Sequence, residues 1–241
     1  MTDQFSRTAL LIGAEGVDRL KEAHVAVFGV GGVGGYACEA LARSGVGAFD
    51  LVDDDTVSLT NINRQIIALH STVGQPKAEV MRQRILDINP EARVTVRRCF
   101  FLPENQDSFP FTTYDYVVDA VDTVAAKVAL AVKCREAGVP LIASMGAGNR
   151  LDGSRFRVTD LFGTSGDPLA RTMRHELRKR GIDRLTVVCS DEPPVTPRAE
   201  ETDEPLPPGK RALPGSAAFA APVAGLLLAG WVVRELCGLN G

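Results

Sequence analysis

The sequence predicts a doubly wound α/β fold with a mostly parallel sheet. Short β-branched runs alternate with segments of helical periodicity, a glycine-rich turn follows the first run, and an acidic cluster ends the second. Repeated β-α-β order needs crossover helices, which pack on both faces of a parallel sheet. The 241 residues are enough to bury the core of one large domain.

The expected elements follow one another along the first part of the chain. We expect strands at residues 24–29, 48–52, 93–99, 114–120 and 140–143. We expect helices between them at residues 36–44, 77–88 and 125–137. Asn89-Pro90 should stop the second of these helices, because the residue before proline resists helical geometry, and Gly138 should end the third.

The pattern is less regular beyond residue 150. Residues 191–209 hold six prolines and six acidic residues, which predicts a mobile loop. Residues 216–233 carry no charge over 18 positions, the lower limit for a membrane-spanning helix. Pro222, Gly225 and Gly230 interrupt this run, which favours a buried C-terminal or subunit-contact helix over a membrane anchor.

Composition and cysteine spacing narrow the class of protein. The formal charge of −3 argues against a generally basic nucleic-acid binder, although a local basic patch stays compatible with it. The N-terminal residues do not show the basic start followed by an apolar run that is typical of a secretory signal. The five cysteines are scattered, and no two form a C-x-x-C pair. We therefore expect a cytoplasmic protein with reduced thiols and without a zinc site.

The glycine-rich turn at residues 29–34, GVGGVG, matches G-x-G-x-x-G between a strand and a helix. Glycines let the backbone approach a phosphate, and the helix N-terminus adds free N–H donors. Asp53, Asp54 and Asp55 end the second strand, where a carboxylate binds ribose hydroxyls. These two features predict a nucleotide site, but they suit NAD as well as ATP.

Residues past the second strand favour ATP. Arg64 lies among several amides in residues 60–65, TNINRQ, and Lys77 opens the next helix. A triphosphate needs such cations more than a dinucleotide does. Asp122 follows the fourth strand, where it could hold Mg²⁺. Singly, Lys77 could be a solvated side chain and Asp122 a helix cap; their joint placement at strand ends favours ATP with magnesium.

Four ordered motifs resemble the ubiquitin-activating-enzyme-like superfamily that includes bacterial MoeB and ThiF. They are GVGGVG, LVDDDTVSLTNINRQ, GQPKAEVMRQRILDINP and DAVDT, and the resemblance covers residues 1 to about 150. It implies an ATP-binding core there, with residues 151–241 forming the substrate-side and dimer-contact part of a single domain at 1–241. The ATP-binding residues that it implies are Gly29, Gly31, Gly32, Gly34, Asp53, Asp55, Asn61, Asn63, Arg64, Gln65, Lys77 and Asp122.

The same resemblance implies catalytic roles for Arg7, Arg64, Lys77 and Asp122, with Asp122 associated with Mg²⁺. Arg7, in FSRTALL, is similar to an N-terminal arginine that reaches ATP in the partner subunit, which implies a homodimer.

Differences from MoeB and ThiF indicate which group within the superfamily the sequence resembles. This sequence lacks their two C-x-x-C zinc pairs, and its layout resembles the tRNA threonylcarbamoyladenosine dehydratases in NINRQIIALHSTVGQPKAEVM, MGAGNRLD, RVTDLFGTSGDPLAR and SDEPP. That implies ATP-dependent activation of the threonylcarbamoyl carboxylate at tRNA adenosine 37, then ring closure with loss of water. Two alternatives stay open: adenylation of a sulfur-carrier protein's C-terminus, and a non-catalytic nucleotide- or NAD-binding module.

The sequence does not identify every partner and ion. A sulfur-transfer partner of cysteine-desulfurase type and a monovalent cation stay open, because no residue pattern identifies either. We expect no DNA partner.

A basic segment supports an RNA substrate. Arg171, Arg174 and Arg178 have helical i, i+3, i+7 spacing and predict a cationic face for tRNA phosphates, with a merely solvated helix as the alternative. Cys189 lies in a β-like run and is interpreted as a buried apolar filler instead of a nucleophile. Asp160, Asp167 and His175 are candidates for substrate positioning without assigned roles.

Overall fold

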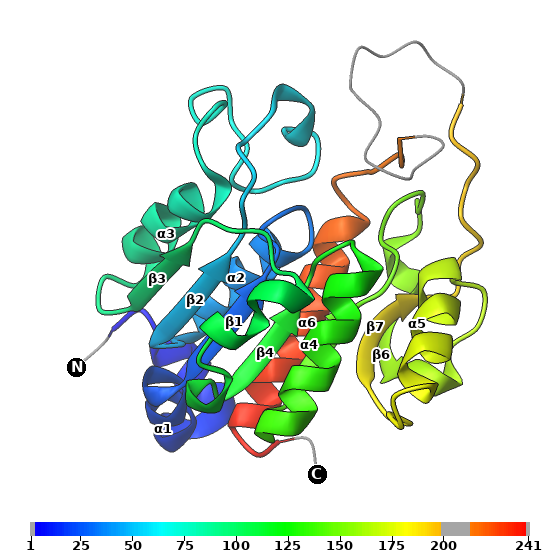
Figure 1. Cartoon of the computed structure of the whole chain (residues 1–241). Coiled ribbons are helices and arrows are strands. Elements are labelled where there is room, and N and C mark those ends of the chain that lie inside the picture. Colours follow the sequence, from blue (N-terminus) through cyan, green and yellow to red (C-terminus); the bar gives the residue numbers. More distant parts are fainter. Residues whose placement is uncertain (1–2, 199–212, 240–241) are drawn as a thin grey trace.

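The computed structural model describes residues 3–198 and 213–239 and contains a seven-stranded sheet of order β3-β2-β1-β4-β5-β7-β6 (Figure 1). Every neighbouring pair is parallel except β6 with β7 at one edge. The strands are β1 His24–Phe28, β2 Ala48–Val52, β3 Arg93–Arg97, β4 Tyr116–Asp119, β5 Leu141–Ser144, β6 Phe156–Asp160 and β7 Thr186–Ser190. The predicted fold class is therefore confirmed.

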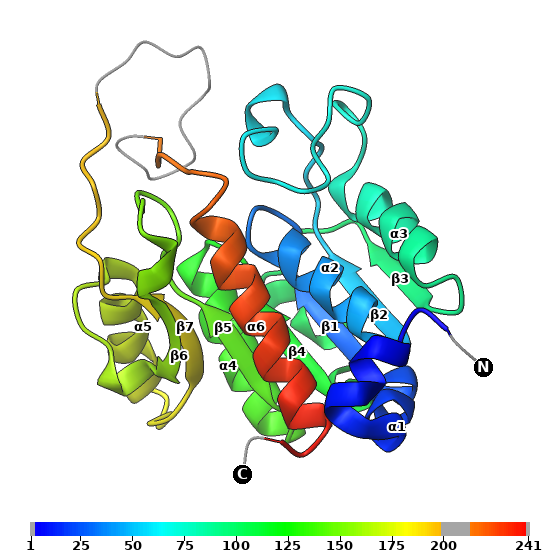
Figure 2. The same cartoon turned by 180° about the vertical axis from the view of Figure 1, so that it is seen from behind.

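Helices cover both faces of the sheet. The α-helices are α1 Ser6–Glu22, α2 Gly34–Ser44, α3 Lys77–Ile88, α4 Val124–Ala137, α5 Pro168–Arg178 and α6 Ala221–Leu236. Short 3-10 turns are η1 Leu59–Asn61, η2 Pro103–Ser108, η3 Phe111–Thr113, η4 Gly153–Arg155 and η5 Leu161–Gly163. The α2 and α6 helices lie side by side on the face that Figure 2 shows in front, and α4 covers the opposite face (Figure 1).

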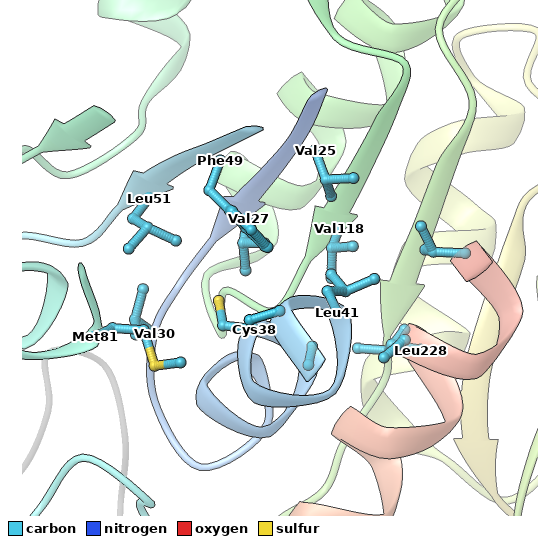
Figure 3. Packing of buried hydrophobic residues seen from close by; sticks show 14 of the residues in the cluster. Val25, Val27, Val30, Cys38, Leu41, Phe49, Leu51, Met81, Val118 and Leu228 are labelled. Carbon is cyan, nitrogen blue, oxygen red and sulfur yellow. The ribbon is translucent and has the colours of Figure 1, made fainter. Parts of the chain in front are cut away.

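Alternating residues of β1 divide the core between the two faces. Val25 and Val27 pack with Leu41 of α2 and Leu228 of α6 in one buried cluster (Figure 3). Phe28 points to the other face, where its ring contacts three buried phenylalanines from the β3–β4 connection. Because both faces of β1 are buried, its sequence is an unbroken apolar run after His24, as expected for a central parallel strand.

A buried carboxylate joins strands β1, β2 and β3. Asp50 accepts hydrogen bonds from Tyr114 at 2.8 Å and Arg97 at 2.7 Å, and lies 3.0 Å from His24 Nε2. Burial raises the pKa of Asp50, but the hydrogen bond to His24, followed by those to Arg97 and Tyr114, outweighs it and brings the pKa to about 2. Asp50 is therefore ionised in the folded protein at neutral pH and belongs to the structural framework.

Two elements were not expected from the sequence. The α1 helix leaves Leu10 and Leu11 about as exposed as side chains can be, at 85% and 86%, and it kinks at Gly13 with φ 77°. It therefore lacks the continuous apolar stripe by which a helix is recognised. The β6 strand is mostly half-buried and pairs antiparallel at the sheet edge, so it shows no buried run either.

The C-terminal apolar run forms α6, which buries Ala224, Leu228 and Val232 completely. This confirms the buried C-terminal helix. Among the described residues, no helix combines the length and apolarity needed to cross a membrane. The loop expected at 191–209 falls partly outside the described residues, which stop at 198 and resume at 213; residues 191–198 have no helix or strand.

Candidate functional site

A cleft of about 940 Å³ opens at the carboxyl ends of the parallel strands. It lies where strand order reverses, because β1 pairs with β2 on one side and β4 on the other. Open α/β sheets bind ligands at this kind of switch point. The loop between β2 and α3 and the chain entering α6 both extend beyond this end of the sheet (Figure 1).

The glycine loop forms one wall of the cleft. Gly29 has φ +86°, and a Cβ on Gly34 would lie only 1.8 Å from the Gly29 carbonyl oxygen. Only glycine fits this close return of the chain, which directs the N-terminus of α2 at the cleft. Gly31 and Gly32 line the cleft directly. Backbone N–H groups at a helix N-terminus form an anion site, so this wall suits phosphate.

Asp53 ties the glycine loop to the end of β2. Its Oδ2 accepts a 2.6 Å hydrogen bond from the Val30 N–H, and its Oδ1 accepts one of 2.9 Å from the Asp55 N–H. Burial raises the pKa of Asp53 above its ordinary value. The carboxylate lines the cleft and keeps further acceptor capacity on both oxygens, because each oxygen can accept a second bond.

Lys77 begins α3 with its side chain almost buried, at 8% exposure. Its Nζ lies 2.6 Å from Asp55 Oδ2, while 65% of the Asp55 side chain is exposed. The carboxylate offsets the cost of a cation at a helix N-terminus. Both residues line the cleft, so an anion that enters it could replace the Asp55 carboxylate as the partner of the Lys77 ammonium.

The segment between β2 and α3 brings the predicted amides and arginine to the cleft. Asn61 accepts from the Ser58 N–H at 3.2 Å, and Arg64 donates to Asn63 Oδ1 at 2.9 Å. Gln65 is buried, and its Oε1 has no hydrogen-bond partner among the described residues. Asn61, Arg64 and Gln65 line the cleft. Asn63 does not, and instead donates to the Ser216 carbonyl at 2.9 Å, joining this loop to the chain before α6.

Asp122 follows β4 and lines the same cleft with an exposed side chain. Among the described residues, no group of three or more histidine, cysteine, aspartate or glutamate side chains could enclose a metal ion. A single carboxylate is nevertheless compatible with Mg²⁺, which binds proteins through one or two carboxylates plus substrate phosphates and water.

Two buried ion pairs beside the cleft were missed at the sequence level. Lys127 has no solvent exposure and lies 3.0 Å from Asp119 Oδ1 and 2.7 Å from the Ser144 carbonyl. Arg150 lies 3.1 Å from Asp167 Oδ2, with both side chains 1% exposed. A lysine inside the apolar run VAAKVAL was an available signal for the first pair. The second pair carried no local signal.

The basic helix α5 lies beside β6 and β7, and its arginines differ in environment (Figure 1). Arg171 is exposed. Arg174 is half-buried and donates to the Thr164 hydroxyl and to the Leu161 carbonyl at 3.5 Å. The Arg178 guanidinium lies over the Phe162 ring at 5.2 Å. None of the three arginines lines the cleft.

Cys189 and Arg7 also lie away from the cleft lining. Cys189 is buried in β7, and burial raises the pKa of its thiol to about 11. The thiolate is the nucleophilic form, so this environment suits a filler. Arg7 is exposed on α1. The α1 helix lies at the end of the molecule opposite the loops of the cleft (Figure 1).

A ThiF family model matches residues 5–239. The chain belongs to the ThiF family. The tRNA threonylcarbamoyladenosine dehydratase of Bacillus subtilis (strain 168) is 47% identical over 242 residues, covering 98% of this chain and 95% of the relative. Its namesake from Escherichia coli (strain K12) is 44% identical, covering 83% of this chain and 77% of the relative. The E. coli molybdopterin-synthase adenylyltransferase is 35% identical over 77% of this chain and 72% of the relative.

Solved structures agree with this membership. The crystal structure of the E. coli tRNA N6-threonylcarbamoyladenosine dehydratase in complex with AMP has a TM-score of 0.88 at 38% identity, covering 98% of this ThiF-family chain and 94% of that one. The complex of the same E. coli protein with ATP has a TM-score of 0.87. E. coli MccB with ATP, at 22% identity and a TM-score of 0.69, shares the fold alone. The predicted family is confirmed.

Proposed function

We infer that this chain is an ATP-dependent tRNA-modifying enzyme, a tRNA threonylcarbamoyladenosine dehydratase. It adenylates the carboxylate of N6-threonylcarbamoyladenosine at tRNA position 37 and promotes its cyclisation with loss of water. The observation that carries this inference is the single cleft that runs from the glycine loop to the start of α5, because it gives ATP and a second substrate one shared space. The names of the relatives that match nearly the whole chain support a modified tRNA as the second substrate.

The reaction balances without a covalent enzyme intermediate. A carboxylate oxygen attacks the α-phosphorus of ATP, and pyrophosphate leaves. An atom of the threonylcarbamoyl group then attacks the activated carbonyl carbon, one proton is lost, and AMP leaves with the former carboxylate oxygen. The nucleoside has therefore lost one water. Because the second step is intramolecular, proximity supplies much of its acceleration.

The nucleotide side of the cleft fits the charges of ATP. We propose that Gly29, Gly31, Gly32 and Gly34 hold the phosphates and that Asp53 binds the ribose, with Asp55 beside it. Asn61, Asn63, Arg64, Gln65 and Lys77 complete the phosphate site in this proposal. In the part of the chain that the structure describes, Arg64 and Lys77 are the two cations lining this side. Cations near the α-phosphate stabilise the charge that develops there.

We propose Asp122 as the protein's carboxylate for Mg²⁺, the ion that would neutralise phosphate oxygens when bound. Its exposed carboxylate on the cleft supports this assignment. Residues 1–150 then form the ATP-binding core, and residues 151–241 form the substrate side of the same domain.

We also propose a homodimer in which Arg7 reaches the partner's ATP. Arg7 does not line its own cleft, and Leu10 and Leu11 expose a large apolar area beside it on α1. Exposed neighbouring leucines are typical of a contact surface.

For tRNA, Arg171, Arg174 and Arg178 remain our proposed contacts. Arg171 and Arg178 are exposed, whereas half-buried Arg174 also holds the η5 turn in place. We therefore expect Arg174 to act partly by shaping this surface, in addition to any phosphate contact of its own.

The decisive experiment incubates the full chain with ATP, Mg²⁺ and tRNA that carries threonylcarbamoyladenosine. Mass spectrometry of the nucleosides should show loss of one water, together with release of AMP and pyrophosphate. A Lys77→Met variant is expected to lose this activity while retaining its circular dichroism spectrum. Binding of NAD in preference to ATP, or an unchanged nucleoside, would overturn the proposal.

The alternative substrate is the C-terminal carboxylate of a sulfur-carrier protein. The same assay separates the two functions: tRNA should stimulate AMP formation by this chain, and a carrier protein should not.

A further inference from the structure

Arg150 is a buried cation with unused hydrogen-bonding capacity. Only 2% of the residue is exposed, and within residues 3–198 and 213–239 its guanidinium makes one hydrogen bond, from Nη2 to Asp167 Oδ2 at 3.1 Å. Its Nε and Nη1 have no hydrogen-bond partner among the described residues. Leaving donors of a buried guanidinium unpaired is costly, and native proteins satisfy such groups with few exceptions. The missing acceptor therefore calls for an explanation.

The position of Arg150 points to a ligand. Among the described residues, three basic residues line the cleft: Arg64 and Lys77 lie on the nucleotide side, and Arg150 lies on the side formed by β5 and α5. The N-terminus of α5 begins at Pro168, beside the same part of the cleft. The helix end and the guanidinium together favour an anion there.

Asp167 does not supply the missing acceptor. Its Oδ1 accepts from the Ala170 N–H at 2.7 Å as the cap of α5, while its Oδ2 is the atom that meets Arg150. A Cβ on Gly146 would lie 2.8 Å from that Oδ2, so the chain after β5 packs directly on the carboxylate. This packing fixes Asp167, and Asp167 in turn orients Arg150 with two nitrogens left over.

We propose that the Nη1 amino group of Arg150, which has no partner among the described residues, binds the carboxylate of the threonylcarbamoyl group. The inference rests on the proposed function and identifies the Arg150 guanidinium as the group that recognises the modified base. A guanidinium N–H that donates to a carboxylate oxygen forms a charge-assisted hydrogen bond, which is stronger than a neutral one. A buried donor suits the end of an extended side group, whereas the sugar-phosphate backbone of a folded RNA stays at the surface.

This contact also makes the first step feasible. A carboxylate that approaches ATP meets the negative charge of the phosphates, and a cation on its own side lowers that repulsion. One carboxylate oxygen can stay on Arg150 while the other attacks phosphorus. After adenylation, the same N–H groups face the carbonyl oxygen, on which charge develops during ring closure.

The test compares two tRNAs that differ only at position 37, one with threonylcarbamoyladenosine and one with adenosine. Their affinities are measured by filter binding to the wild type and to Arg150→Gln in the presence of a non-hydrolysable ATP analogue. We expect Arg150→Gln to weaken binding of the modified tRNA roughly 10- to 100-fold, as for loss of a charged hydrogen bond, and to leave the unmodified tRNA unchanged. Arg93→Gln, which removes the same charge from an exposed residue at the far edge of the sheet, should bind both tRNAs like the wild type.

Other outcomes overturn the inference in distinguishable ways. Equal weakening of both tRNAs would mean that Arg150 contacts a phosphodiester, and weaker binding of the ATP analogue would place it on the nucleotide. Unchanged discrimination would mean that it touches neither substrate. If the wild type forms no cyclised nucleoside, the proposed function itself fails, and this inference fails with it.

A second variant guards against loss of folding. Arg150→Gln leaves Asp167 buried without its counter-charge, so Arg150→Gln/Asp167→Asn is tested in parallel. Asparagine still caps a helix, and the double variant buries neither charge. It should show the same selective loss for the modified tRNA.

Discussion

Lys127 lies fully buried in α4, and replacing it with Met keeps the length of the side chain while removing its charge. The ammonium makes two hydrogen bonds, one to Asp119 and one to the Ser144 carbonyl. A hydrogen bond that involves a charged group contributes about 1.5–3 kcal/mol, so losing both should cost about 3–6 kcal/mol. Removing one partner of a buried ion pair destabilises a protein by about 3–5 kcal/mol. The estimate from the hydrogen bonds and the estimate from the ion pair therefore agree.

Urea unfolding monitored by circular dichroism and by the fluorescence of Trp231, the single tryptophan, measures this free energy. Lys133→Met is the matched control, because Lys133 lies on the same helix but pairs with the exposed Asp107. It should cost no more than about 1 kcal/mol. Lys127→Met/Asp119→Asn should recover about 2 kcal/mol or more, since no charge is then left buried. A cost below about 1 kcal/mol for Lys127→Met, or simple additivity in the double variant, would refute the reasoning.

Three further predictions concern pH, the glycine loop and the buried thiol. Although burial raises the pKa of Asp50, its hydrogen bonds to His24 and Arg97 help lower it from 3.8 to about 2, so its ionisation adds about 2 kcal/mol of stability above about pH 4. This contribution is lost as the pH falls towards 2, and in urea titrations the stability gap between wild type and Asp50→Asn should narrow over that range; a constant gap would contradict it. Gly34→Ala should abolish ATP binding in calorimetry, because a Cβ there would lie 1.8 Å from a backbone oxygen of the glycine loop, and normal affinity would exclude the described loop geometry. Cys189→Ser should retain cyclisation within about threefold, whereas complete loss with pyrophosphate exchange intact would assign the thiol a catalytic role.

The central strands and their helices were predictable because each carries a local signal. The apolar run before Gly29 specifies β1, and Gly138 ends α4 with φ 70°, as expected for a left-handed helix end. The predicted bounds of α3 agree with the structure at both ends.

The missed features depend on contacts between distant residues. Arg150 and Asp167 are 17 residues apart, and nothing near either position indicates that both become buried. Leu10 and Leu11 of α1 face outward while Val17 and Leu20 are buried, so the helix shows no continuous apolar periodicity. In the cleft, sequence motifs identified Arg64, Lys77 and Asp122 as lining residues, but only the fold brings Arg150 to the same space.

The place of α6 in the chain has a consequence for synthesis. It packs beside α2, an element from the start of the sequence, and its first residue, Ala221, lines the cleft. Until the ribosome has released α6, the nascent chain exposes the apolar surface around Leu41 and lacks part of the cleft wall. We therefore expect newly made chains to need protection from aggregation, and ATP to assist folding only after translation has passed this helix.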